Sequence, residues 1–286
     1  MTGKSETTQG VAGLDLRIVE TAKIIPHEIA DEQRSTQLAS LLRRDKVLKN
    51  PPIVAVLDET KGTFVILDGT NRVTALATLG VHHALVQVVN YGPPQVELHT
   101  WHHVVTDILS WDLILSFERI AGLEIHITGL AQARQAMEAG EILAYGALYD
   151  GRAFILKDNL DDACQRARLL NEIVGVYTRH GHLNRAATND LGQLFRLYPD
   201  LICVMTFAEY KPADVIELAR NGLHAPAGVT RHLIQGRALR VNYPLDRLQA
   251  PGSLAKKNHE LIEWISFRFK QRHVRYYAEA VYLFDE

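Results

Sequence analysis

Several features by which classes of protein are recognised are scarce in this sequence or missing from it. Only two of the 286 residues are cysteines, Cys164 and Cys203, and neither belongs to a CxxC motif. A disulfide framework is therefore excluded, and core thiols in a reducing, cytoplasmic compartment are expected. The apolar runs have the length of strands, too short to cross a bilayer, and no repeat of fixed period occurs. Residues 1–15 lack the apolar segment of a signal peptide and predict a flexible tail.

An excess of charge of one sign is also missing. The chain carries 31 Lys and Arg against 33 Asp and Glu, which gives a formal net charge of −2. Without a basic field, binding of a nucleic acid through its phosphates is not expected. The 47% hydrophobic and 22% charged residues are typical of an ordinary globular protein, and the length allows two domains.

The first part of the chain alternates short apolar runs with helical patterns. Pro51-Pro52 separates a helix that Asp31 can cap from the next apolar run, and Gly80 follows a second helix where a left-handed residue is favoured. The predicted elements are a strand in 16–24, a helix after Asp31, a hairpin of strands in 53–57 and 64–67, a helix in 70–79 and a strand in 85–89.

The second half mixes helical and strand patterns without regular alternation. A hairpin in 145–156 turns at Asp150-Gly151, and the acidic pair Asp161-Asp162 begins an amphipathic helix in 160–180. Further helices are predicted in 128–140, 212–219 and 254–269, and further strands in 201–207 and 273–284. The predicted fold class is therefore α+β.

The strongest local motif is the run Leu67-Asp68-Gly69-Thr70-Asn71-Arg72, which lies where a strand is expected to end and a helix to begin. Free N–H groups of the first helical turn can donate to anionic oxygens, and the Arg72 guanidinium can pair with a phosphate. Asp68 can hold a divalent cation. The alternative is an ordinary strand-to-helix turn in which Asp68 or Thr70 caps the helix and Arg72 is solvated.

A set of short motifs recurs in a fixed order along most of the chain. They are Ile25-Pro26-His27-Glu28, Leu48-Lys49-Asn50-Pro51-Pro52-Ile53, Leu67 to Leu76 with Gly80, Val89-Asn90-Tyr91 before Glu97-Leu98 and Trp101, Gly228-Val229-Thr230-Arg231-His232, and Arg275-Tyr276-Tyr277 before Tyr282-Leu283-Phe284. In this order the sequence resembles the ParB/sulfiredoxin superfamily and, within it, most closely the free L-serine kinases. The resemblance implies a ParB/sulfiredoxin-like α/β N-terminal domain in residues 16–105 and an α+β C-terminal domain in residues 106–286 that closes over the cleft and completes the substrate pocket.

Members of that branch transfer a phosphoryl group from ATP or ADP to free L-serine, giving O-phospho-L-serine, and the similarity implies a role for each matching position. Glu28 would be the catalytic base that accepts the proton of the serine hydroxyl. Asp68 would position Mg²⁺ or the substrate. The residues implied to hold the phosphates are Gly69, Thr70, Asn71 and Arg72, and those implied to enclose serine are Trp101, Thr230, Arg231 and His232. The carboxylate of a small zwitterion needs a cation, and the Thr230–His232 cluster with its arginine is expected to supply it.

One position departs from the family pattern. The relatives usually have Asp-Gly-His-His-Arg, whereas Thr70 and Asn71 stand at the two middle positions here. Asparagine can donate hydrogen bonds but cannot carry a proton or a charge. Slow turnover, another hydroxy amino acid as substrate and a catalytically silent sensor therefore stay open as alternatives to serine phosphorylation.

A DNA-associated, ParB-like regulator that binds nucleotide without kinase activity is the alternative from another functional class. No helix-turn-helix pattern follows Val105, and the near-neutral charge offers little phosphate affinity, so the kinase is preferred. A metal site of histidines at His82-His83 or at His99 with His102-His103 is not expected, because no HExxH pattern accompanies them and His99 and His103 share a face only in a helix.

Overall fold

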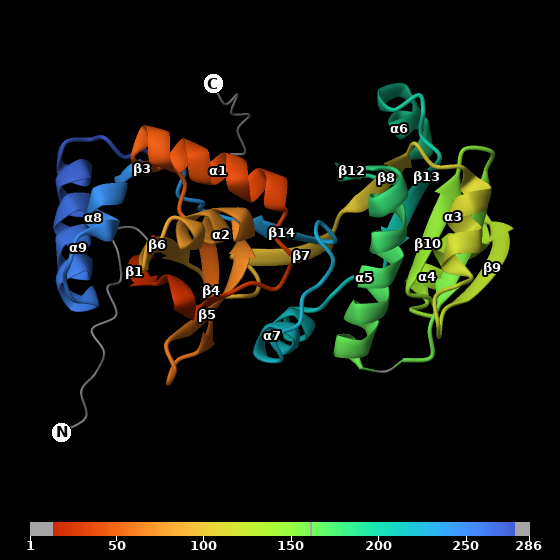
Figure 1. The fold of residues 1–286 in the computed structure, drawn as a ribbon, viewed down its shortest axis with the longest axis horizontal. Coiled ribbons are helices and arrows are strands. Elements are labelled where there is room, and N and C mark those ends of the chain that lie inside the picture. The colour runs from red at the N-terminus through yellow and green to blue at the C-terminus, as the bar shows by residue number, and fades with distance from the viewer. Residues whose placement is uncertain (1–13, 161, 278–286) are drawn as a thin grey trace. The chain divides into compact units, whose positions relative to one another are not determined.

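The computed structural model describes residues 14–160 and 162–277, and these residues form two compact units. Unit 1 contains the chain up to residue 25, residues 30–96 and the chain from residue 234 onward, and unit 2 contains residues 26–29 and 97–233. Both units combine helices with sheets (Figure 1), which confirms the α+β fold class. Residues 1–13 of the predicted flexible tail and the end of the predicted C-terminal strand, from residue 278 onward, lie outside the described residues. Residues 273–277 are described and form no strand, so the strand prediction is wrong there.

This division differs from the predicted boundary at residue 105 in two respects. The chain beyond residue 234 returns to unit 1, because Tyr243, Leu245, Leu248 and Leu261 are buried in the same core as the first strands. The short segment 26–29 leaves unit 1 and joins unit 2. Neither feature is visible in local sequence patterns, since both depend on contacts between residues about 200 positions apart.

Unit 1 is built on a five-stranded sheet in the order β1-β6-β4-β5-β2. Its strands are β1 (Leu16–Glu20), β2 (Ile24–Ile25), β4 (Ile53–Asp58), β5 (Thr63–Asp68) and β6 (His83–Val88), and the short strands β3 (Val47–Leu48) and β15 (Tyr243–Pro244) pair with each other. Its helices are α1 (Glu32–Asp45), α2 (Thr70–Thr78), α8 (Leu245–Gln249) and α9 (Leu254–Lys270). β4 runs antiparallel to β5 and parallel to β6, so α2 carries the chain across the sheet between β5 and β6.

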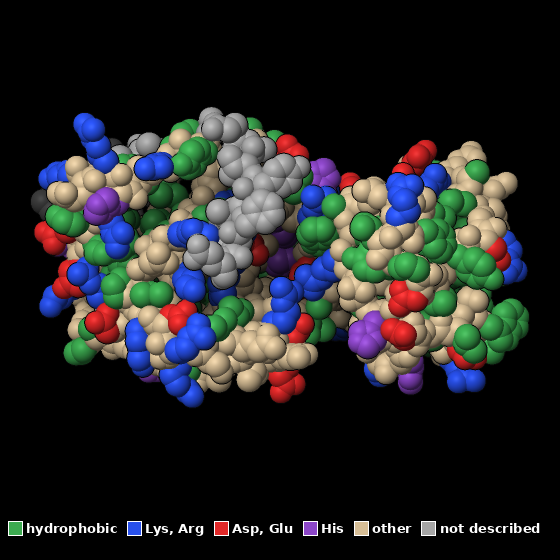
Figure 2. Space-filling model, turned by 90° about the horizontal axis from the view of Figure 1, so that it is seen from above, with side chains coloured by type: hydrophobic (Ala, Val, Ile, Leu, Met, Phe, Trp, Pro, Cys, Tyr) green, Lys and Arg blue, Asp and Glu red, His purple; other side chains and the backbone are tan. Residues whose placement is uncertain are grey.

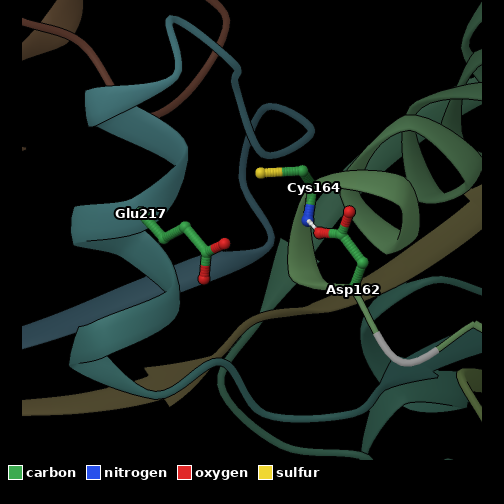
Figure 3. A group of neighbouring side chains, drawn as sticks. All are labelled: Asp162, Cys164 and Glu217. Atoms are coloured by element: carbon green, nitrogen blue, oxygen red, sulfur yellow. Dashed lines mark hydrogen bonds between the residues drawn. The ribbon is translucent and has the colours of Figure 1, made fainter.

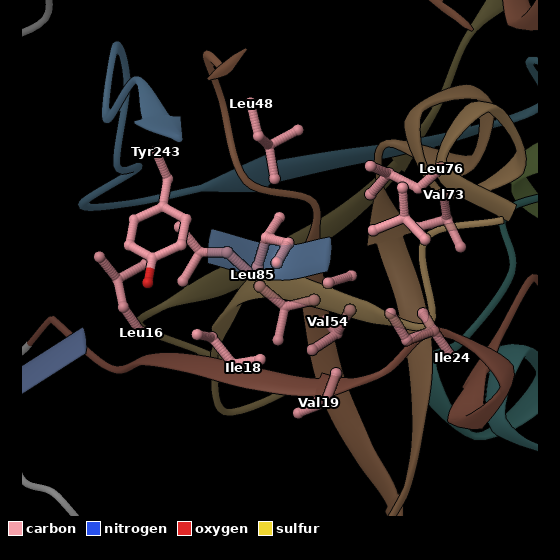
Figure 4. Packing of buried hydrophobic residues seen from close by; sticks show 14 of the residues in the cluster. Leu16, Ile18, Val19, Ile24, Leu48, Val54, Val73, Leu76, Leu85 and Tyr243 are labelled. Atoms are coloured by element: carbon pink, nitrogen blue, oxygen red, sulfur yellow. The ribbon is translucent and has the colours of Figure 1, made fainter. Parts of the chain in front are cut away.

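The core of unit 1 lies between this sheet and its helices, and it joins segments from both ends of the chain. Figure 4 shows Leu16 and Ile18 of β1 near Tyr243 of β15. Leu85 of β6, which pairs with Ile18, belongs to the same cluster. Leu76 and Leu85 have no exposed surface, and Tyr243 is only 1% exposed. The predicted helix cap at Asp31 is confirmed, because its side chain accepts a hydrogen bond from the Arg34 N–H at 2.9 Å at the start of α1.

Unit 2 contains a six-stranded antiparallel sheet in the order β12-β8-β13-β10-β11-β9. The strands are β8 (His102–Thr106), β9 (Glu124–Gly129), β10 (Ala144–Leu148), β11 (Arg152–Lys157), β12 (His182–Ala186) and β13 (Cys203–Phe207), and β7 (Val96–Thr100) pairs with β14 (Thr230–Ile234) in a separate two-stranded sheet. The helices are α3 (Ser110–Phe117), α4 (Leu130–Glu138), α5 (Ala163–His180), α6 (Leu191–Leu197) and α7 (Pro212–Arg220). The predicted hairpin across Asp150-Gly151 is confirmed as β10 and β11.

Alternation along the strands assigns the two faces of this sheet to different helices. On one face, Val104 and Val204 pack against α6, and Tyr145 and Ala147 pack against α4. The neighbouring residue His103 points to the opposite face, where its ring contacts Tyr177 of α5 and Phe207. The face that carries His103 is called face A below.

Charged side chains do not form a one-sided patch on the surface shown in Figure 2, where basic and acidic groups are interspersed. Within the described residues, no helix combines the length and the apolar character that crossing a bilayer requires.

We expect Leu85→Ala to lower the free energy of unfolding of unit 1 by about 2–5 kcal/mol, because it leaves a cavity at a fully buried position of β6. Val56→Ala in the adjacent strand β4 provides the control, since Val56 is 38% exposed, and it should cost about 1 kcal/mol or less. Urea unfolding followed by circular dichroism measures both. Equal losses in the two variants would contradict the assigned core.

Candidate functional site

The motif at residues 68–72 is the junction of β5 and α2 in unit 1. β5 ends at Asp68, and Gly69 is the N-terminal capping position of α2 with φ of 101°. Glycine is required there, because this φ is strained for other residues and a Cβ would lie 2.9 Å from Arg72 Nη2. In the described part of the chain, the N–H groups of Thr70 and Asn71 meet no acceptor. The junction therefore presents two backbone donors at a helix N-terminus.

Three charged side chains surround this junction. Arg72 Nη2 donates to Asp68 Oδ2 at 2.9 Å, and Arg72 Nη1 donates to the carbonyl of Asn50 at 3.0 Å. Arg237, from the loop after β14, donates to the same Asp68 oxygen. Two guanidinium groups and one carboxylate leave a local charge of +1, which favours an anionic ligand.

Arg237 was missed by the sequence analysis, because it lies 169 positions from Asp68. The buried side chain of Gln87 places it: Gln87 Nε2 donates to the carbonyl of Gly236 at 2.9 Å, and Gln87 Oε1 accepts from the N–H of Ala238 at 2.8 Å. The signal available in the sequence, an arginine in a polar loop, does not distinguish Arg237 from other surface arginines.

Asn71 has a structural task in addition to its predicted contact with nucleotide. Its Oδ1 accepts from the N–H of Asp31 at 2.9 Å and from Ser35 Oγ at 3.2 Å, which ties the beginning of α1 to that of α2. Because a backbone N–H can only donate, the Asn71 atom that faces Asp31 must be the oxygen, and the Nδ2 amide retains its two donors.

The carboxylate of Glu28 is held in unit 2 by a loop about 200 residues further along the chain. Oε2 accepts from the N–H of Gly228 at 3.3 Å, and Oε1 accepts from the N–H of Thr230 at 3.1 Å. The hydroxyl of Thr230 also donates to Oε1, so it accepts from His27 Nε2, which lies 2.9 Å away. A carboxylate has about four lone-pair positions, and three donors leave one for a substrate proton.

Strand alternation separates the residues that were predicted to enclose serine. Thr230 and His232 point to the side of β14 where Glu28 and His27 lie, and the rings of His27 and His232 meet edge to face with centroids 5.2 Å apart. Arg231 points to the other side, where its guanidinium lies 4.6 Å from the centre of the Trp101 ring. The structure thus brings Glu28, Thr230 and His232 together and places Arg231 with Trp101.

Neutral histidines support the loop that holds Glu28. His103 Nε2 lies 2.8 Å from the Gly228 carbonyl and must donate to it, and Nδ1 accepts from the hydroxyl of Tyr177 at 2.7 Å. Burial lowers the pKa of His103 to about 4 and, with the neighbouring His27, the pKa of His232 to about 3. Both rings are therefore uncharged near neutral pH.

The histidine pairs named in the sequence form no metal site among the described residues. His99 belongs to β7 and His103 to β8, so the helical spacing that would join them is missing. Among the residues that the structure describes, one group of potential metal ligands is present: Asp162 and Cys164 at the start of α5 and Glu217 within α7 (Figure 3). Asp162 accepts from the Cys164 N–H at 2.7 Å, and both carboxylates are exposed, as acidic groups commonly are without a metal. We assign no metal to this cluster.

Comparison with known proteins identifies relatives along most of the chain. No protein-family model matches. The ATP-dependent L-serine kinase SbnI of Staphylococcus aureus is 26% identical over 276 residues, which cover 95% of this chain and 97% of that protein. An ATP-dependent L-serine kinase of Desulfurococcus mucosus is 25% identical over 250 residues, covering 81% and 90%.

Solved structures show the same fold. SbnI with a C-terminal truncation superposes with a TM-score of 0.71 at 22% identity, covering 89% of this chain and 97% of that one. Free serine kinase in complex with AMP gives a TM-score of 0.66 at 17% identity, covering 82% and 93%. The predicted resemblance to the free L-serine kinases is confirmed.

We expect Gly69→Val and Arg72→Ala to weaken nucleotide binding. Valine at φ of 101° is strained and its Cβ displaces the Arg72 guanidinium, whereas Arg72→Ala leaves Asp68 without one of its two cations and removes the links to Asn50 and Pro51. Calorimetric titration with ATP measures the effect, which should be about tenfold or more in Kd for Gly69→Val. Arg43→Ala, on the exposed surface of α1, is the matched control. Affinities equal to wild type in both loop variants would mean that the junction only connects a strand to a helix.

We expect the stability of unit 2 to fall as the pH is lowered from about 6.5 to about 4. The folded-state pKa of His103 lies below its unfolded value, so the unfolded chain binds the proton first and stability is lost as pH falls through this window. Each fully buried histidine contributes on the order of 1 kcal/mol per pH unit. Urea unfolding at pH 7, 6 and 5 should show a smaller dependence in His103→Gln than in the exposed control His126→Gln. An identical dependence in both variants would contradict this assignment.

Proposed function

We propose that this chain is a kinase that transfers a phosphoryl group from ATP to free L-serine and releases O-phospho-L-serine. The observation that carries the proposal is Glu28, whose carboxylate is fixed by Gly228 and Thr230 with one lone-pair position left for a substrate proton. Similarity to an L-serine kinase over 95% of the chain supports the same conclusion. Because these relatives are described as ATP-dependent L-serine kinases, ATP is preferred to ADP as the donor.

In the proposed reaction, unit 1 binds the nucleotide at the junction of β5 and α2. The N–H groups of Thr70 and Asn71 donate to phosphate oxygens, and Arg72 and Arg237 balance their charge. Gly69 allows the backbone to approach the phosphates closely. The Asn71 amide replaces a histidine of the family pattern and supplies hydrogen-bond donors without a charge.

Magnesium fits this junction as an ion that arrives with the nucleotide. Mg²⁺ is commonly held by one or two carboxylates together with substrate phosphates, and Asp68 supplies one carboxylate that is 35% exposed. Asp68 would hold the ion in exchange for one of its two arginine contacts. When bound, Mg²⁺ offsets the negative charge of the phosphates.

Unit 2 supplies the base and the surroundings of the amino acid. Glu28 accepts the hydroxyl proton as the serine oxygen attacks, and the donors on Gly228 and Thr230 keep its carboxylate in position. His232 and Thr230 line the same side of β14, and Trp101 with Arg231 lies on the other side. We further propose a reducing, cytoplasmic setting, in which the free thiols of Cys164 and Cys203 persist.

The alternative of a DNA-associated, nucleotide-binding regulator makes a different prediction for the same protein. It requires the junction at residues 68–72 and does not require Glu28. Phosphorus NMR of the protein with Mg²⁺, ATP and L-serine, threonine or homoserine separates the two, because only the kinase forms a phosphate ester. ATP binding without any ester product would overturn the kinase proposal.

We expect Glu28→Gln to lower kcat by about 10²-fold or more while the Kd for ATP stays near that of wild type. The amide keeps the shape of the side chain but cannot accept the hydroxyl proton. Glu118→Gln, at the exposed end of α3, is the matched control and should turn over like wild type. Turnover that survives in Glu28→Gln would remove this residue from the role of base.

A further inference from the structure

A bound serine needs a cation for its carboxylate on the side of β14 where Glu28 lies. Arg231, the arginine in the Gly228–His232 motif, points away from Glu28 because successive residues of a strand face opposite sides. A second observation agrees. Burial, together with the nearby charge of Arg231, lowers the pKa of His102, so Arg231 lies near His102. The His102 side chain is hydrogen-bonded to Thr206 on the face of the sheet opposite to face A. The requirement of the substrate is therefore not met by Arg231.

Arg185 of β12 is a cation on the required side. In the register of β12 and β8, Arg185 lies directly opposite His103, so the two side chains share face A. Both reach the same residue: His103 donates to the carbonyl of Gly228, and the guanidinium of Arg185 covers the Cα of Gly228 so closely that a Cβ would overlap it. The N–H of Gly228 in turn donates to Glu28.

The guanidinium of Arg185 is open to a ligand. The side chain is exposed, and within the described residues no carboxylate lies within ion-pairing distance of it. The Arg185 guanidinium, which lies close to Gly228, can present its donors in a planar fork that matches a carboxylate in two-point geometry. Gly228, with φ of 75°, cannot be replaced by a larger residue without displacing it.

Unit 2 also contains a buried hydroxyl without a partner, which belongs to Tyr210. Tyr210 is 9% exposed, and its hydroxyl has no hydrogen-bond partner in the structure described. Burial raises its pKa, with further contributions from the charges of Asp214 and Glu28, so the hydroxyl remains a donor at neutral pH. An unsatisfied buried donor is costly unless a ligand accepts from it.

We propose that Arg185 binds the carboxylate of the amino-acid substrate and thereby selects a free α-amino acid over an uncharged hydroxy compound. This inference rests on the proposed kinase function. Arg185 would hold the acid group while the hydroxyl reaches Glu28, so it is a substrate-binding residue that determines specificity. The ligand class is a small hydroxy amino acid with an ionised carboxylate.

The test compares L-serine with L-serinamide, which has the same hydroxyl and amine but no carboxylate charge. In Arg185→Ala, we expect kcat/KM for L-serine to fall about 10- to 100-fold, and kcat/KM for L-serinamide to change less than about threefold. Arg185→Lys should recover part of the loss, because it restores the charge without the planar fork. The Kd for ATP should stay as in wild type.

Two further arginine variants complete the design. Arg196→Ala, on the exposed surface of α6, is the matched control and should leave both substrates unaffected. Arg231→Ala should lower the preference for L-serine over L-serinamide less than Arg185→Ala does. The proposal is overturned if Arg185→Ala affects both substrates equally or neither, or if Arg231→Ala alone abolishes the preference.

Calorimetric titration of L-serine without nucleotide distinguishes failure of this inference from failure of the kinase proposal. Wild-type protein that binds L-serine without phosphorylating it would overturn the kinase activity, and the loss of binding in Arg185→Ala would still decide the role of Arg185. Wild-type protein that does not bind L-serine at all would overturn the assignment of Arg185 as well. Circular dichroism spectra that match wild type establish that each variant is folded.

Discussion

The hydrogen bonds from Gly228 and Thr230 to Glu28 are the interaction on which the proposed chemistry of unit 2 depends. They join Glu28 to residues 200 and 202 positions further along the chain. The donors are backbone N–H groups, which have no rotamers to change. The loop that provides them is fixed in turn by His103, whose neutral ring connects the Gly228 carbonyl to Tyr177. A carboxylate held this way takes two of its three hydrogen bonds from the backbone, whose position does not depend on a side-chain rotamer.

In unit 1 the corresponding constraint is electrostatic. Asp68 at the end of β5 lies between two guanidinium groups, and the N-terminus of α2 adds two backbone donors. The arrangement is complete only when the chain returns from residue 234 onward, because Gln87 fixes the segment that carries Arg237. The segment from residue 234 onward also adds Tyr243 and Leu261 to the core of unit 1. The stability of unit 1 and the position of Arg237 therefore both depend on the packing of this segment.

Short-range features of the fold were accessible to sequence analysis because they depend on local chemistry. The cap at Asp31, the hairpin at Asp150-Gly151 and the strand-to-helix junction at Gly69 follow from side chains and dihedral preferences within a few residues. The division of the chain into units was not accessible, because burial of the segment after residue 234 depends on partners near the N-terminus.

The sequence by itself determined the α+β class, the motif order that resembles the free L-serine kinases, and the candidates Glu28 and residues 68–72, because each has a local pattern. Only the tertiary structure decided which side chains face one another. It placed Arg231 on the far side of β14 from Glu28, and it brought Arg185 and Arg237, which belong to no motif, to Gly228 and Asp68. The physical reason is that strand register and the return of distant segments set these contacts, and neither leaves a local trace in the residues involved.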